Sequence, residues 1–332
     1  MGNSRVMVAI RDQEHLDGLV NLAYRMAVNP NVRSPRKSFE SGQKTASMWW
    51  KVMLFVILGL TIAIAGVLVY GSRNWHSAAE RIHTRLEAGR LPASARTYDS
   101  RELDGLPAPV QSYFRAVLKH GQPIVSAVSV EHTGTFNMSE TGEQWKPFTS
   151  SQRIVTRRPG FLWEGRIRMM PGLTVRVHDA YVNGEGILHP TLFGLVSLAN
   201  LGGTPEMARG EVMRFLAEAA SYPTALLPSQ GVQWAAINAS SANATLQDGE
   251  TVVTLLFRFG QDGVIESIRA DARGRTVAGA VIPTPWEGRW RNYQAREGMR
   301  IPLEGEVAWI LPKGPRPYWR ARITKLRYEF AQ

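Results

Sequence analysis

The amino-acid sequence predicts an α+β protein that is mainly β. We expect an N-terminal transmembrane helix followed by a curved antiparallel sheet, half-barrel-like, with helices on its concave face. Three observations predict this fold class. Residues 52–70 are apolar and uncharged, short β-branched and aromatic runs separated by turn residues fill the chain beyond Gly121, and one helical pattern over residues 206–220 interrupts those runs. Such short runs with turn signals are typical of antiparallel sheets.

Four parts follow from these patterns along the chain. We expect a basic cytoplasmic tail over residues 1–47, a transmembrane signal-anchor helix over 48–70, a helix and linker over 71–105, and a β-rich soluble domain over 106–332. The tail includes a candidate amphipathic helix over residues 12–28.

Composition excludes several functional classes. No cysteine occurs among the 332 residues, which excludes disulfides, cysteine-ligated zinc, iron–sulfur clusters and a thiol nucleophile. The formal net charge is +11, but the basic residues form no dense run. A mildly basic solvated surface explains that charge, so we expect no nucleic-acid partner.

The apolar run has the length and edges of a membrane span. About 20 residues at 1.5 Å rise cover roughly 30 Å of hydrocarbon, and residues 52–70 carry no charge over nearly that length. Trp49 and Trp50 lie at one edge, and Tyr70 and Trp75 at the other, where amphipathic rings favour the headgroup zone. A buried core helix is the alternative, but the run is apolar on every helical face.

Orientation rests on flanking charge and on the segment that starts at Met48. Five basic residues precede the span closely and four follow it, which favours a cytoplasmic N-terminus. Met48 and the residues after it are similar to the start of a secretory signal, so the native chain could begin there. Because no clean cleavage site follows before the charges begin, we expect an uncleaved signal anchor. The expected location is the bacterial inner membrane, with the C-terminal domain periplasmic.

Local patterns predict the helices. Residues 72–88 lack Gly and Pro and should continue the anchor helix. Pro107 opens a short helix whose apolar face holds Val110, Tyr113, Phe114, Val117 and Leu118. Thr204 is a candidate N-cap with Pro205 in the first helical position, and the apolar residues 192–198 ahead of it form a helix or a lid.

Turn residues and parity predict the strands. Asn183-Gly184, Asp248-Gly249 and Asp262-Gly263 each suit a two-residue hairpin loop, and residues 251–259 alternate as a half-buried strand does. The apolar residues move from odd to even sequence positions near Thr324-Lys325, as they do at a β-bulge or a strand end. We expect roughly nine to eleven strands.

Five short runs resemble a bacterial family of uncharacterised membrane-anchored proteins, classed as a domain of unknown function. They lie at residues 145–148, 159–163, 181–186, 222–228 and 302–309. The resemblance covers about residues 106–330 and implies no established activity or catalytic residue. A curved sheet with helices over its concavity is also similar to LolA- and LppX-like lipoprotein carriers.

Catalytic and metal-binding signatures are absent from the sequence. It contains no Gly-x-Ser-x-Gly elbow, His-Glu-x-x-His helix, Walker loop or Gly-x-Gly-x-x-Gly motif. His178 and Asp179 point to opposite faces of an extended strand, Glu185 follows a turn, and His189 stands at an expected helix start. We predict no catalytic residue, metal site or cofactor, and the sequence favours a protein that is not an enzyme.

Four residues are candidate ligand contacts. Phe161 and Trp163 share a strand face and either line an apolar cavity or belong to the core. Trp286 and Arg289 lie in a Trp/Arg/Glu cluster that could grip an anionic ligand. Alternatively, the tryptophan anchors a loop while Glu287 pairs with an arginine at the surface.

Three functions remain open at this stage. The first is a membrane-anchored module that binds a lipid or other apolar ligand, since ligand sites are concave and mostly apolar. The second is a cell-envelope interaction or scaffold protein without a ligand cavity. The third is a carboxylate-based hydrolase, because Asp and Glu carry no local signature.

Overall fold

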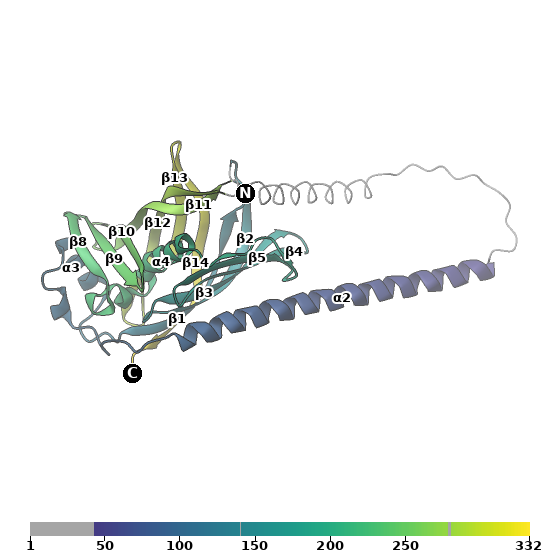
Figure 1. Cartoon of the computed structure of the whole chain (residues 1–332), viewed down its shortest axis with the longest axis horizontal. Helices are drawn as coiled ribbons and strands as arrows, with labels where there is room; N and C mark the ends of the chain where they lie inside the picture. The colour runs from purple at the N-terminus through teal and green to yellow at the C-terminus, as the bar shows by residue number, and fades with distance from the viewer. Residues whose placement is uncertain (1–42, 140, 278–279) are drawn as a thin grey trace, which may run out of the picture. The chain divides into compact units, whose positions relative to one another are not determined.

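The computed structural model describes residues 43–139, 141–277 and 280–332 (Figure 1). Residues 1–42, including the candidate helix over 12–28, lie outside the described residues. The chain divides into two units, Met1–Ile62 and Ala63–Gln332.

Helix α2 (Gln43–Ala88) is continuous and includes the predicted span. Within the described part of the chain it is the one helix long and apolar enough to cross a membrane. Its large apolar side chains between Val52 and Tyr70 are exposed. The continuation of the helix over residues 72–88 is confirmed.

The strands in the described residues form one antiparallel sheet of 14 strands. The order is β6-β5-β4-β3-β2-β1-β14-β13-β12-β11-β10-β9-β8, with β7 paired to β5. The sheet is curved and does not close, as the sequence predicted. Its strands are β1 (Val125–Asn137), β2 (Trp145–Val155), β3 (Gly160–Met170), β4 (Leu173–Val182), β5 (Glu185–Leu192), β6 (Val196–Ser197), β7 (Leu201–Gly202), β8 (Gln233–Asn238), β9 (Ser241–Asp248), β10 (Thr251–Phe259), β11 (Ile265–Val277), β12 (Ala280–Arg296), β13 (Met299–Leu311) and β14 (Gly314–Phe330).

The sheet consists of two meanders. Strands β1 to β5 follow one another outward from the middle of the order, and β8 to β14 return to it, so β1 pairs with β14. Helix α4 (Pro205–Glu218) lies in the chain between the two meanders and packs in the concavity of the sheet (Figure 1). It contacts β3, β4 and β5 of one meander and β10 and β11 of the other.

The start of α4 follows from its sequence. The Thr204 hydroxyl accepts a hydrogen bond from the Met207 backbone N–H at 3.2 Å, and Pro205 follows the cap as predicted. On β5, a Cβ at Gly186 would lie 2.8 Å from the Met207 backbone carbon and 2.9 Å from the Ala208 nitrogen. A glycine at this position therefore allows β5 and α4 to approach closely.

The remaining helices are short and pack on the core. Helix α3 (Ala108–Val117) buries the five apolar residues predicted for its face, counting Leu118 just beyond its end. Tyr98 and Leu103, in the segment expected to be a linker, are also buried in the core. The 3₁₀ turns are η1 (Ser100–Leu103), η2 (Ala219–Ser221), η3 (Pro223–Leu226) and η4 (Pro228–Gln230).

The hairpin predictions hold in part. Asn183 and Gly184 form a two-residue loop with φ of 55° and 89°. In the next hairpin the loop residues are Gly249 and Glu250, because Asp248 pairs with Thr251. The prediction of a two-residue loop at Asp262-Gly263 is wrong. Phe259 pairs with Ile265, so the turn lies inside a longer loop, in which the Gly260 N–H donates to the Val264 carbonyl at 2.9 Å.

Two further strand predictions are confirmed, and two are corrected. Residues 251–259 alternate between buried and less buried positions, and Thr324 is the extra residue of a bulge, because Glu131 pairs with Lys325 and His132 with Ile323. Residues 192–198 are not a helix: Phe193 and Gly194 have φ of 56° and 74°, which ends β5 in a turn before β6. The lid reading stays a prediction, and Leu198 of this segment lines the cavity described below. The expected strand number was too low, partly because two-residue strands such as β6 and β7 have no periodic pattern.

The last turns of α2, within the unit Ala63–Gln332, pack on the sheet. The Trp75 side chain is buried and stacks on the His178 ring with centroids 4.5 Å apart. The guanidinium carbons of Arg166 and Arg176 lie 5.5 and 5.3 Å from its ring centroid. Stacking and cation–π contacts therefore hold this part of the helix.

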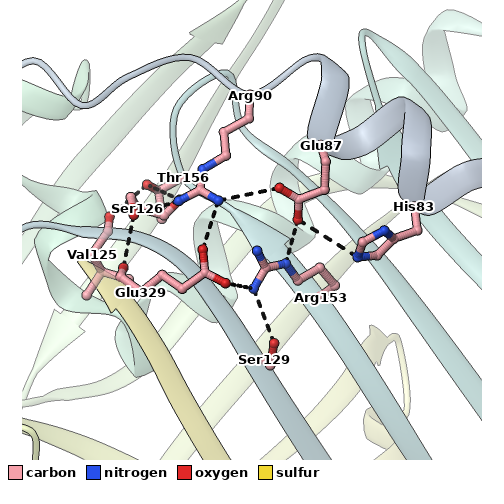
Figure 2. A network of polar contacts seen from close by, with 9 residues as sticks. All are labelled: His83, Glu87, Arg90, Val125, Ser126, Ser129, Arg153, Thr156 and Glu329. Atoms are coloured by element: carbon pink, nitrogen blue, oxygen red, sulfur yellow. Dashed lines mark hydrogen bonds and ion pairs between the residues drawn. The ribbon is translucent and has the colours of Figure 1, made fainter. Parts of the chain in front are cut away.

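Ion pairs continue this contact towards the helix end (Figure 2). The Glu87 carboxylate accepts from Arg153 at 2.7 Å and from Arg90 at 3.4 Å. Both arginines also reach Glu329 on β14, at 2.7 and 2.9 Å. Hydrogen bonding from Arg153 and Arg90 lowers the pKa of Glu329 to about 2.

Substituting Trp75 with alanine should release the last turns of α2 from the sheet. Loss of a buried tryptophan typically lowers stability by about 3–5 kcal/mol. Here the lost contacts are those that join the last turns of α2 to the sheet. We expect faster trypsin cleavage after Arg81 and Arg85 of the full chain in nanodiscs. Glu80→Ala, an exposed change on the same helix, is the matched control, and equal cleavage of the two variants would contradict this packing.

Candidate functional site

A cavity of about 680 Å³ lies between the concave face of the sheet and α4. Its lining comes from both meanders and from the helix. This volume lies within the range of about 300–1,000 Å³ that is common for ligand sites. The two halves of the chain therefore build one concave site.

Most of the cavity wall is apolar and aromatic. Five tryptophans contribute to it, from β3, β12, β13 and β14: Trp163, Trp286, Trp290, Trp309 and Trp319. The Trp286 indole N–H donates to the Tyr318 hydroxyl at 2.9 Å, and Tyr318 stacks on Trp309 with centroids 5.7 Å apart. Aliphatic side chains such as Ile167, Val177 and Leu188 complete the apolar surface.

Arg214 of α4 is the centre of a charged cluster in the same cavity. Its guanidinium donates to Asp179 on β4 at 2.6 Å and to Glu218, one turn further along α4, at 2.7 Å. Its carbon also lies 4.7 Å from the Phe161 ring centroid and 5.5 Å from that of Trp163. Arg214 is therefore paired on both sides and packed on aromatic rings.

Glu211 and Arg273 form the second part of the cluster. The Arg273 guanidinium, from β11, lies 3.6 Å from Glu211 Oε1 and 5.0 Å from the Trp286 ring centroid. Burial and the nearby Asp179 together raise the pKa of Glu211 to about 8, against the lowering effect of Arg273 and Arg214. Burial also raises the pKa of Asp179. Near neutral pH, Glu211 is therefore mainly a neutral carboxylic acid.

Two carboxyl oxygens of the cluster have no hydrogen-bond partner among the described residues. They are Asp179 Oδ1 and Glu211 Oε2. When Glu211 is neutral, its carboxyl proton can be donated in a hydrogen bond. Unpaired polar atoms at a cavity wall are positions where a ligand or water can bond.

The four predicted ligand contacts lie in different places. Trp163 and Trp286 line the cavity. Phe161 is fully buried against Arg214 and lies outside the lining. Arg289 lies on the opposite face of β12 from Trp286, with 61% of its side chain exposed, and pairs with Glu287 at 2.7 Å. Ligand binding by these residues stays a prediction. Of the alternative reading, the Glu287–arginine pair is present, but Glu287 is buried and Trp286 lies within β12 rather than in a loop.

Other polar candidates from the sequence have local roles. His178 stacks on Trp75 while Asp179 faces the cavity, so the two do lie on opposite strand faces. Glu185 pairs with Arg85 at 2.6 Å. His189 lies within β5 and not at a helix start. Across the described ranges, no group of three or more His, Cys, Asp or Glu could hold a metal ion.

Sequence reasoning missed the charged cluster itself. Glu211, Arg214 and Glu218 recur at helical spacing on the face of α4 that also carries buried apolar residues. Charges on an apolar helix face were the available signal, although Arg214 and Glu218 alone look like an ordinary exposed i,i+4 pair.

An open antiparallel sheet and the helix that bridges its two meanders enclose one cavity, with aromatic walls and a charged cluster in its lining. The chain belongs to a family of unknown function (DUF6920), which it matches over residues 104–328. The expected membership of an uncharacterised family is confirmed. In structure the chain is similar to a LolA superfamily protein from Nitrosomonas europaea, with a TM-score of 0.28, 10% identity, and 68% of this chain and 94% of that chain covered. No curated protein sequence matches the chain.

Proposed function

We propose that this protein is a membrane-anchored binding protein for a lipid or another apolar molecule. The observation that carries the proposal is the cavity of about 680 Å³ with five tryptophans in its wall. An apolar chain placed there leaves water for an aromatic surface, which contributes about 0.8 kcal/mol per buried methylene.

The anchor in this proposal is the part of α2 between residues 52 and 70. The sequence supports a signal anchor in the bacterial inner membrane, with the domain over residues 106–332 on the periplasmic side. In that arrangement the cavity belongs to a protein that stays attached to a source of apolar ligands.

Within the site, we assign ligand contact to Trp163 and Trp286. Phe161 supports the site through Arg214, on which it packs. Arg289, on the outer face of β12, has no ligand contact in this proposal.

Mass spectrometry and chain-length dependence test the proposal. The full chain, purified in nanodiscs, should bind 1-dodecanol, with empty nanodiscs as the blank. 1-Decanol should bind about tenfold more weakly, because it lacks two methylenes of about 0.8 kcal/mol each. Native mass spectrometry should also detect a co-purified apolar molecule. Equal binding of the two alcohols, with no such molecule, would overturn the proposed function.

Filling the cavity gives a second test. Val307 of β13 lines the cavity, so Val307→Trp should weaken 1-dodecanol binding at least tenfold by occupying the space of the ligand. Val252→Trp makes the same change at an exposed position of β10 and should leave binding within about twofold. Unchanged binding in Val307→Trp would mean that the ligand lies elsewhere.

A further inference from the structure

Arginines outnumber carboxylates in the lining of the cavity. Four guanidinium groups line it, those of Arg214, Arg273, Arg275 and Arg316, against the three carboxyl groups of Asp179, Glu211 and Glu218. The cavity thus combines apolar walls with an excess of positive charge.

Two of these arginines already have partners. Arg214 is paired with Asp179 and Glu218 at 2.6 and 2.7 Å. Arg316 donates to the backbone carbonyls of Ser139 and Gly142. Both guanidinium groups therefore already donate to protein oxygens, although Nε of Arg316 has no partner among the described residues.

Arg273 differs from them. Its side chain is only 12% exposed, its ion pair with Glu211 is 3.6 Å long, and the described residues give its guanidinium no hydrogen bond. A buried guanidinium has five donors in a planar fork and strongly favours a carboxylate or phosphate. When Glu211 carries its proton, no ionised carboxylate pairs with Arg273.

We propose that the cavity selects amphiphiles with a single anionic head group, a carboxylate or a phosphate, that accepts hydrogen bonds from Arg273. The chain of the amphiphile lies along the tryptophan wall, and the half-buried Arg275 adds positive charge to the same lining. This inference rests on the proposed function and adds the chemical class of the ligand.

The pH dependence of binding follows from the groups that face Glu211. These are Asp179 from β4, Arg214 and Glu218 from α4, Arg273 from β11 and Tyr318 from β14. A bound anion at Arg273 favours neutral Glu211, whose pKa is already about 8. Above that pH, ionised Glu211 competes for Arg273 and repels the ligand, so anion affinity should fall.

Probes of equal chain length separate the head group from the chain. Dodecanoate, dodecyl phosphate, 1-dodecanol and dodecyltrimethylammonium are titrated against the full chain in phosphatidylcholine nanodiscs, with tryptophan fluorescence as the readout. At pH 7 we expect at least one anion to bind tenfold or more tighter than 1-dodecanol, and the ammonium probe to bind most weakly. Which anion binds tighter distinguishes a carboxylate from a phosphate head. Between pH 7 and 9.5 the advantage of the anion over 1-dodecanol should fall at least threefold.

Variants at two positions of β11 complete the test. Arg273→Gln should remove the tenfold advantage of the anion over 1-dodecanol, and a cooperative thermal unfolding transition shows that the variant is folded. Arg273→Lys should retain part of the advantage, and Arg269→Gln, a change outside the cavity lining, should retain all of it. Equal binding of 1-dodecanol and the anions would overturn the head-group inference but not the proposed function. Tightest binding of the ammonium probe would assign recognition to the carboxylates instead, and failure of every probe would overturn both.

Discussion

Arg214→Met should lower the free energy of unfolding by about 3–5 kcal/mol, the typical effect of breaking a buried ion pair by removing one partner. Methionine keeps much of the length of the side chain but leaves Asp179 and Glu218 without the cation that pairs them at 2.6 and 2.7 Å. Two like charges then remain in a cavity with few other donors. The change also removes the cation–π contacts with Phe161 and Trp163.

Urea denaturation followed by tryptophan fluorescence measures this effect. Arg209→Met is the matched control, because Arg209 lies on the same helix and is exposed. The difference between Arg214→Met and the unsubstituted protein should shrink in acid, because burial raises the pKa of Asp179 and its carboxyl group becomes neutral there. A midpoint equal to that of Arg209→Met at pH 7 would contradict the pairing described above.

Glu211→Gln should make the protein more stable in alkali and leave it nearly unchanged at pH 5. The pKa of Glu211 rises from 4.5 to about 8 on folding, so the folded chain binds this proton more tightly than the unfolded chain. The stabilisation is full below about pH 4.5 and is lost as the pH rises through 8. Glutamine resembles the neutral acid and does not titrate, so the variant should exceed the unsubstituted protein at pH 9 by a few kcal/mol.

Thermal unfolding between pH 5 and pH 9 provides the measurement. The melting temperature of the unsubstituted protein should fall relative to that of Glu211→Gln over this interval. Glu206→Gln, in the exposed first turn of α4, should run parallel to the unsubstituted protein. If Glu211→Gln also ran parallel, Glu211 would have an ordinary pKa in the folded protein.

Features set by neighbouring residues could be predicted from the sequence. The anchor run over residues 52–70, the Asn183-Gly184 turn and the alternation over 251–259 each depend on local backbone geometry. The bulge at Thr324 was also visible, because one extra residue reverses the parity of every later side chain. These local features were sufficient to predict a curved sheet with a helix on its concave face.

The charged cluster could not be predicted in this way. Asp179 and Arg214 are 35 residues apart, and only the packing of α4 against β4 brings them together. The pairing of β11 with β12 shifts register between Ala270 and Arg273. Simple alternation along β11 therefore does not predict which face of the sheet carries the Arg273 side chain. The cavity itself has no sequence signal, because a tryptophan in a cavity wall and one in a packed core follow the same apolar pattern.

The pairing of β1 with β14 affects how the protein can be made on the ribosome. β14 leaves the ribosome after every other described strand, yet it lies between β1 and β13 in the sheet order. Until it is synthesised, both of those neighbours have an unpaired edge, and exposed edges can pair with other chains. Joining them also closes a loop that contains both meanders, and the entropy lost in this step grows with loop length. A nascent chain that stalls before Gly314 therefore has two half-sheets with open inner edges, and a chaperone that shields these edges would act on the strands that later become the middle of the sheet.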